Sequence, residues 1–90
     1  MGVYTPLYLS KGVKMNRDLI TDIGLYCKNV RLNQNVSLKD FAILNNDNLK
    51  NIWAFENGKA NNIKYIFYYF KLFDSDSDQK EYVRGLFNIL

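Results

Sequence analysis

Apolar residues recur at intervals of three and four along most of this 90-residue chain, which is the spacing of one face of an α-helix. The first 16 residues show no steady period and are expected to form an N-terminal arm. The helical pattern begins at Arg17, and Asn16 precedes it as a candidate N-cap. The pattern predicts five helices, at about residues 17–32, 37–44, 49–56, 63–73 and 77–90.

The segments between these helices are rich in residues that cap helices or form turns. Ser37 is a favourable N-cap for the second helix. Residues 45–48, Asn-Asn-Asp-Asn, predict a tight turn, because asparagine tolerates the left-handed conformation that sharp turns often need. Gly58 is expected to end the third helix as its C′ residue. The acidic run at residues 74–78 is interpreted as a helix start, where carboxylates suit the helix dipole.

Length and composition indicate a single compact all-α bundle of about five helices. Apolar residues make up 48% of the chain and charged residues 23%, as in globular proteins. The fourth helix is expected to place Tyr65, Tyr68 and Tyr69 around the rim of an apolar face. No apolar run approaches the ~20 residues of a membrane span, and the N-terminus does not resemble a signal peptide. A cytoplasmic protein is therefore expected.

Side chains suited to catalysis and metal binding are scarce. Histidine is absent and Cys27 is the only cysteine, so no internal disulfide, standard zinc site, Ser–His pair or Cys–His pair can form. Asp74, Asp76 and Asp78 match the first ligands of a calcium loop, but Gln79 stands where that loop requires glycine. We therefore expect no metal, no cofactor and no enzymatic activity.

Charge is unevenly distributed along the chain. Residues 1–73 contain ten Lys and Arg against five Asp and Glu, a net charge of +5, whereas residues 74–90 contain two against four, a net charge of −2. A basic body of this kind suits a polyanionic partner. Lys11, Lys14 and Arg17 lie at or near the N-terminal arm and are candidates for phosphate contacts.

Three stretches in the middle of the chain carry a resemblance to a known family. They are IGLYCKNVR at residues 23–31, VSLKDFA at 36–42 and NIWAFENGK at 51–59. In a register without gaps they resemble the lambda-repressor-like helix-turn-helix family of the Xre/Cro type. That family ends its first helix in arginine, places a small polar cap before an apolar–Ala pair, and very often ends its third helix in apolar-Glu-Asn-Gly-Lys. The following stretch, NNIKYIFYYFKLF, fits the next helix if one loop residue is deleted.

The resemblance implies a helix-turn-helix domain at residues 17–73 that binds double-stranded DNA with its third helix in the major groove. Lys50 suits guanine acceptors or a phosphate, and Asn51 suits adenine or the DNA backbone. Arg31 and Glu56 occupy positions that pair in relatives as a partly buried ion bridge. The implied DNA contacts are Ser37, Lys39, Asn48, Leu49, Lys50, Asn51, Trp53, Ala54, Asn57 and Lys59.

The chain departs from the family's pattern around the turn and on the third helix. Asn46 and Asp47 stand where the family usually has glycine and an aliphatic residue, and Leu38 replaces a common glutamine. Leu49 and Trp53 place apolar surface where hydrogen-bonding side chains are frequent. These two side chains suit thymine methyl groups and a protein partner equally well.

The last segment, residues 74–90, is expected to be an acidic linker followed by a C-terminal helix. The apolar stripe of this helix either covers the core or forms a two-fold dimer contact, and the dimer is favoured. The stripe comprises Tyr82, Val83, Leu86, Phe87 and Leu90. The predicted function is a homodimeric transcriptional repressor or controller of a bacterial, phage or mobile-element promoter. The alternative is a helix-turn-helix scaffold that binds a protein partner, such as an inhibitor of a host protein.

Overall fold

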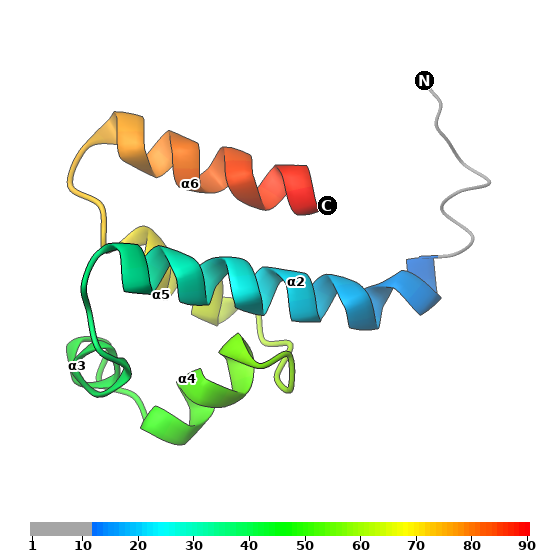
Figure 1. Cartoon of the computed structure of the whole chain (residues 1–90), viewed down its shortest axis with the longest axis horizontal. Helices are drawn as coiled ribbons and strands as arrows, with labels where there is room; N and C mark the ends of the chain where they lie inside the picture. Colours follow the sequence, from blue (N-terminus) through cyan, green and yellow to red (C-terminus); the bar gives the residue numbers. More distant parts are fainter. Residues whose placement is uncertain (1–11) are drawn as a thin grey trace.

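The structure, a computed structural model, describes the backbone of residues 12–90 and the side chains of residues 19–90. This part of the chain contains five α-helices and no β-strand, which confirms the predicted all-α fold. The long helix α2 runs through the middle of the molecule, with α6 along one side and α3 and α4 along the other (Figure 1). The helices are α2 (Gly12–Asn33), α3 (Leu38–Leu44), α4 (Leu49–Glu56), α5 (Lys64–Phe70) and α6 (Asp76–Ile89).

Helix α2 starts earlier than the apolar pattern predicts. It begins at Gly12, so the predicted start at Arg17 and the assignment of Asn16 as its N-cap are wrong. Residues 13–15 include lysine and methionine, which favour helix, and contain no breaker. These first turns extend past the end of α6 (Figure 1), where no neighbouring helix imposes an apolar period. The predicted arm therefore loses residues 12–16 to the helix, and the rest of it lies outside the described residues, as do the side chains proposed to contact phosphates there.

The ends of the other helices follow local chemistry closely. Ser37 Oγ accepts a hydrogen bond from the Asp40 amide at 3.0 Å and caps α3, as predicted. In the turn after α3, Asn46 has a φ of 51°, the left-handed conformation that the asparagine run anticipated. Gly58 follows α4 with a φ of 73°, which suits its predicted place as the C′ residue.

The two C-terminal helices differ slightly from their predicted ranges. Helix α5 ends at Phe70, earlier than predicted, and residues 71–72 form a turn. Helix α6 begins at Asp76, where Ser75 Oγ accepts a hydrogen bond from the Asp78 amide at 3.1 Å. Asp76 and Asp78 lie in the first turn of α6, as the interpretation of the acidic run as a helix start requires.

The hydrophobic core joins all five described helices, and three of its members are tyrosines. Tyr65 and Tyr69 are buried, so their predicted place at the rim of α5 is wrong. Tyrosine can be buried when its hydroxyl has a partner; Tyr69 donates to Glu56 Oε2 at 2.8 Å and Tyr82 donates to the Ile66 carbonyl at 2.7 Å. The core comprises Cys27, Phe41, Ala42, Ile52, Phe55, Tyr65, Tyr69 and Tyr82.

Two glycines allow α2 to approach its neighbours closely. A Cβ atom at Gly24 would overlap the carbonyl oxygen of Phe55 at the crossing of α2 and α4. A Cβ atom at Gly85 would overlap the hydroxyl of Tyr26 at the crossing of α2 and α6.

Among the described helices, none is both long enough and apolar enough to cross a membrane.

Candidate nucleic-acid interface

Helix α4 buries one face and exposes the other. Ile52, Phe55 and Glu56 are buried against the rest of the molecule. Of the ten residues predicted to contact DNA, only Ala54 is half-buried, and the other nine are exposed. The exposed nine are Ser37, Lys39, Asn48, Leu49, Lys50, Asn51, Trp53, Asn57 and Lys59. The predicted contacts therefore lie at the start of α3, along the outer face of α4 and in the loop that follows it.

The first turn of α4 and its last residues use asparagine side chains as caps. Asn48 Oδ1 accepts a hydrogen bond from the Lys50 amide at 2.7 Å, so Asn48 is the N-cap of α4. Asn57 Nδ2 donates to the Trp53 carbonyl at 2.8 Å. Both side chains stabilise the ends of α4, which limits the hydrogen bonds that they can offer to a ligand.

Asp47 holds the turn between α3 and α4 against α5. Its Oδ1 accepts hydrogen bonds from the Asn48 amide at 2.5 Å and from Asn51 Nδ2 at 3.1 Å, and its Oδ2 accepts one from the Tyr68 hydroxyl at 2.6 Å. The bond from Tyr68 is the main cause that lowers the pKa of Asp47, and the same bond raises the pKa of Tyr68 to about 12. A polar contact thus occupies the position where the resemblance implies an apolar side chain.

A buried ion pair fixes α4 to α2. Arg31 Nε and Nη2 donate to the two carboxylate oxygens of Glu56 at 2.8 and 2.9 Å, and both residues are buried. Arg31 Nη1 also donates to the Val36 carbonyl at 2.8 Å. The hydrogen bond to Glu56 raises the pKa of Arg31. Since Tyr69 supplies a further donor to Glu56, this network joins α2, α4, α5 and the loop before α3.

The outer surface of α3 and α4 also carries apolar side chains. Leu49 is 42% exposed and Trp53 is 47% exposed. On α3, Ile43 and Leu44 are exposed to an even greater extent. Lys50 lies between Leu49 and Trp53 in the sequence, so this surface combines positive charge with exposed apolar area.

The apolar stripe predicted for dimerisation divides into core and surface. Tyr82 is 2% exposed and is a core residue, so its assignment to an exposed dimer contact is wrong. Val83 and Leu86 are half-buried, whereas Phe87 and Leu90 are exposed.

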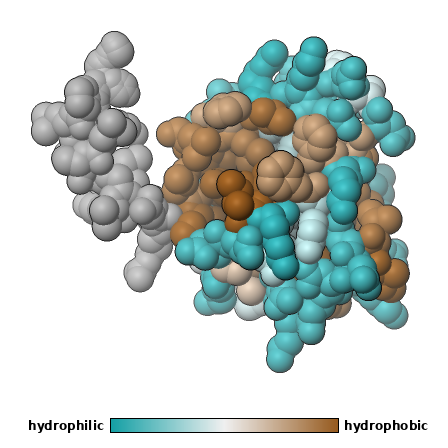
Figure 2. Space-filling model, turned by 180° about the vertical axis from the view of Figure 1, so that it is seen from behind, coloured by the Kyte–Doolittle hydropathy of each residue, from teal (hydrophilic) through white to brown (hydrophobic). Residues whose placement is uncertain are grey.

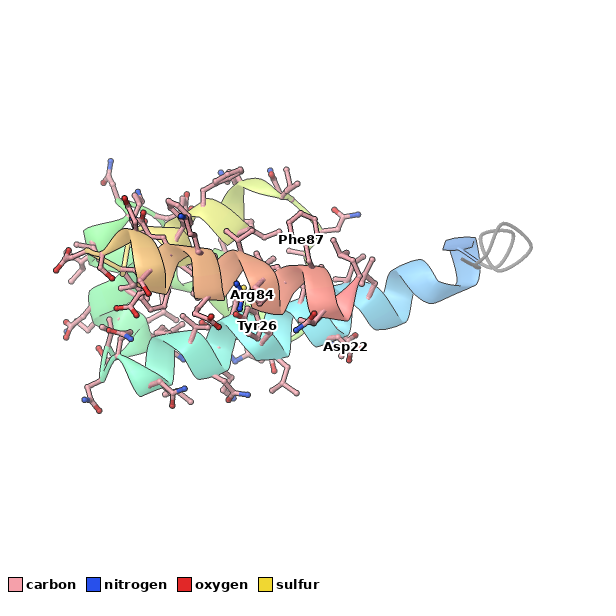
Figure 3. All side chains as sticks on the ribbon, turned by 90° about the horizontal axis from the view of Figure 1, so that it is seen from above. Asp22, Tyr26, Arg84 and Phe87 are labelled. Atoms are coloured by element: carbon pink, nitrogen blue, oxygen red, sulfur yellow. The ribbon has the colours of Figure 1, made fainter. Side chains whose placement is uncertain are left out.

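These four residues line a cleft of about 450 Å³ that α2 and α5 also border. Figure 2 shows the apolar surface that surrounds the cleft, and Figure 3 shows Phe87 on the α5 side of α6 with Asp22 on the α2 side. Ile63 and Phe67 extend this surface onto α5. This exposed apolar surface on α5 was not predicted, because helical spacing alone does not separate an exposed apolar face from a buried one.

Comparisons with known proteins assign no further chemistry to these surfaces. No protein-family model, curated protein or solved structure matches the chain. The described residues include no group of three or more Cys, Asp or Glu side chains placed to hold a metal ion.

Proposed function

We propose that this protein is a sequence-specific DNA-binding transcriptional regulator of the lambda-repressor-like helix-turn-helix type. The observation that carries the proposal is the outer face of α4, which is exposed while its inner face is fixed to α2 by the Arg31–Glu56 pair. A rigid helix with an exposed polar and basic face suits the major groove, which is wide enough to admit an α-helix. Helix α4 is thus the proposed recognition helix.

Each exposed side chain of α4 has a chemical counterpart on duplex DNA. Lys50 donates to guanine O6 and N7 or to a phosphate, and Asn51 pairs with adenine. Leu49 and Trp53 contact thymine methyl groups. Lys39 and Lys59 flank α4 and bind phosphates, which contributes affinity without sequence preference. Binding should therefore weaken steeply as salt concentration rises.

The proposed regulator acts as a homodimer that represses a promoter in the cytoplasm of a bacterium, or from a phage or mobile element. The proposed dimer contact is the exposed apolar surface of α6, with Phe87 and Leu90 at its centre. In Figure 1, α6 and α4 lie on opposite sides of α2, so a contact through α6 leaves α4 free. Two copies then present one α4 to each of two successive major grooves.

Selection from a pool of randomised duplexes tests this function and identifies the operator sequence in the same experiment. The expected result is enrichment of one sequence by the natural protein, loss of that enrichment in Lys50→Ala, and little change in Lys80→Ala. Lys80 is the matched control because it is an exposed lysine on α6, away from α4. Failure to enrich any sequence, by a protein that is folded, would refute sequence-specific binding.

The second candidate function is a protein-binding module built on the same helices. The exposed apolar side chains of α3 and α4 favour it, since such surface is typical of protein contacts. A partner captured through this surface would bind with little dependence on salt and would be lost in Trp53→Ala. That result, together with no duplex binding at low salt, would favour this function over DNA recognition.

A further inference from the structure

Asp47 connects a tyrosine of α5 to an asparagine on the proposed recognition helix. Its Oδ2 accepts from the Tyr68 hydroxyl at 2.6 Å, and its Oδ1 accepts from Asn51 Nδ2 at 3.1 Å. Asp47 and Asn51 are four residues apart, and Tyr68 is 21 residues beyond Asp47 in the sequence. Contacts outside α4 can therefore influence how Asn51 faces a ligand.

The carboxylate determines which end of the Asn51 side chain faces outward. An ionised carboxylate only accepts hydrogen bonds, so the NH₂ group of Asn51 must face Asp47. The amide oxygen Oδ1 of Asn51 then faces away from Asp47. Without this constraint, a carboxamide can present either its oxygen or its nitrogen, because the two ends have nearly the same shape.

The side chain of Tyr68 is itself held in place by its neighbours. Its ring packs edge-on against Tyr65, with ring centres 5.4 Å apart, and lies 6.4 Å from the ring of Phe41. Lys71 Nζ lies over the Tyr68 ring, 5.3 Å from its centre. Because these contacts involve the ring, Tyr68→Phe removes the hydroxyl and leaves the ring contacts in place.

We infer that Tyr68 and Asp47 are positioning residues that set the base preference of Asn51. This inference rests on the proposed DNA-binding function. With one hydrogen of Nδ2 committed to Asp47, Asn51 retains one N–H donor and the Oδ1 acceptor. That pair matches adenine, whose N7 accepts and whose N6 amino group donates in the major groove. Guanine presents two acceptors at the same positions and thymine presents O4 and a methyl group, so both are rejected.

The experiment uses the duplex that the natural protein enriches from the randomised pool, and a second duplex in which the adenine contacted by Asn51 is replaced by guanine. That adenine is the position whose preference disappears in Asn51→Ala. The natural protein should prefer adenine by about tenfold. Tyr68→Phe and Asp47→Asn should each reduce the preference roughly twofold, because a constraint on the Asn51 amide is lost. Tyr65→Phe, which removes a hydroxyl from the neighbouring ring, is the matched control and should keep the preference.

A double-mutant cycle distinguishes positioning from a general loss of structure. If Tyr68 acts through Asn51, then adding Tyr68→Phe to Asn51→Ala should change the base preference no further. Equal effects of Tyr68→Phe in both backgrounds would overturn the inference while leaving DNA binding intact.

A nuclear magnetic resonance measurement on the free protein tests the link without DNA. The Nδ2 hydrogen of Asn51 that is bonded to Asp47 should exchange with water more slowly than the side-chain amide hydrogens of an exposed asparagine without this bond. Tyr68→Phe should remove the difference, and unchanged exchange would overturn the inference. Absence of any duplex binding by the natural protein would refute the proposed function instead, and with it the adenine preference.

Discussion

Replacement of Arg31 by methionine should remove a large share of the stability of the fold. Methionine fills a similar length but provides no donors, so Glu56 keeps only the hydrogen bond from Tyr69. The Val36 carbonyl also loses its bond to Arg31 Nη1. The side chains of the pair are 6% and 2% exposed, and water cannot readily replace the lost donors. A carboxylate would then remain buried without a counter-charge.

The expected cost follows from this burial. Removing one partner of a buried ion pair typically costs about 3–5 kcal/mol. A domain of this length has a free energy of unfolding of roughly 5–13 kcal/mol, so the variant loses a large share of it. At about 4–8 °C per kcal/mol, the unfolding temperature should fall by at least ~12 °C.

Thermal unfolding followed by far-ultraviolet circular dichroism measures this change. Arg84→Met is the matched control, because Arg84 pairs with Glu81 at 3.0 Å while their side chains are 68% and 66% exposed. The exposed pair should contribute less than ~1 kcal/mol. Equal losses of stability in Arg31→Met and Arg84→Met would refute the argument that burial makes the Arg31–Glu56 pair costly to break.

Three further predictions follow from close packing, burial and charge. Gly24→Ala forces a Cβ atom against the backbone of α4 and should cost about 1–3 kcal/mol, whereas the exposed Asn29→Ala on the same helix should have little effect in urea denaturation. Burial raises the pKa of Cys27 to about 12, so little of its thiol is ionised at pH 8 in the folded protein. The thiol should therefore react with Ellman's reagent at least about a hundredfold more slowly in the folded than in the unfolded protein. Equal rates would contradict this. The pKa of Asp47 is lowered from 3.8, so the ionised carboxylate stabilises the folded protein. The difference in free energy of unfolding between the natural protein and Asp47→Asn should be full at pH 5 and should vanish as pH falls through the lowered pKa of folded Asp47. A difference in urea denaturation that stays constant with pH would disprove this role of the carboxylate.

The sequence predicted helix ends where a single residue type has a clear local preference. Ser37, Asn46 and Gly58 each adopt the conformation or hydrogen bond that their chemistry favours. The start of α2 was missed, because its first turns extend beyond the other helices and carry no apolar period. Local preference and periodicity therefore account for most of the fold, and periodicity fails where a helix leaves the core.

The candidate site was less predictable than the fold, because its decisive contacts join distant segments. The Arg31–Glu56 pair was expected from the resemblance, but the contributions of Tyr69 and Tyr68 were not. Helical spacing alone predicts that a tyrosine hydroxyl lies at the rim of a core. Burial of the side chain depends on a hydrogen-bond acceptor from a distant segment, and spacing does not show that acceptor. Asp47 was identified as a departure from the family, yet its partner on α5 could not be derived from sequence spacing.

Binding of duplex DNA by α4 should change the fluorescence of Trp53, which lies on this helix and is the only tryptophan of the chain. Duplex DNA from upstream of the gene is titrated into the protein at low and moderate salt, beside an unrelated duplex and beside the Lys50→Ala variant. If α4 binds in the major groove, the fluorescence change should be larger with the upstream duplex, should weaken as salt rises and should be largely lost in Lys50→Ala. An unchanged signal with both duplexes at low salt, from a protein that circular dichroism shows to be folded, would contradict duplex binding by α4.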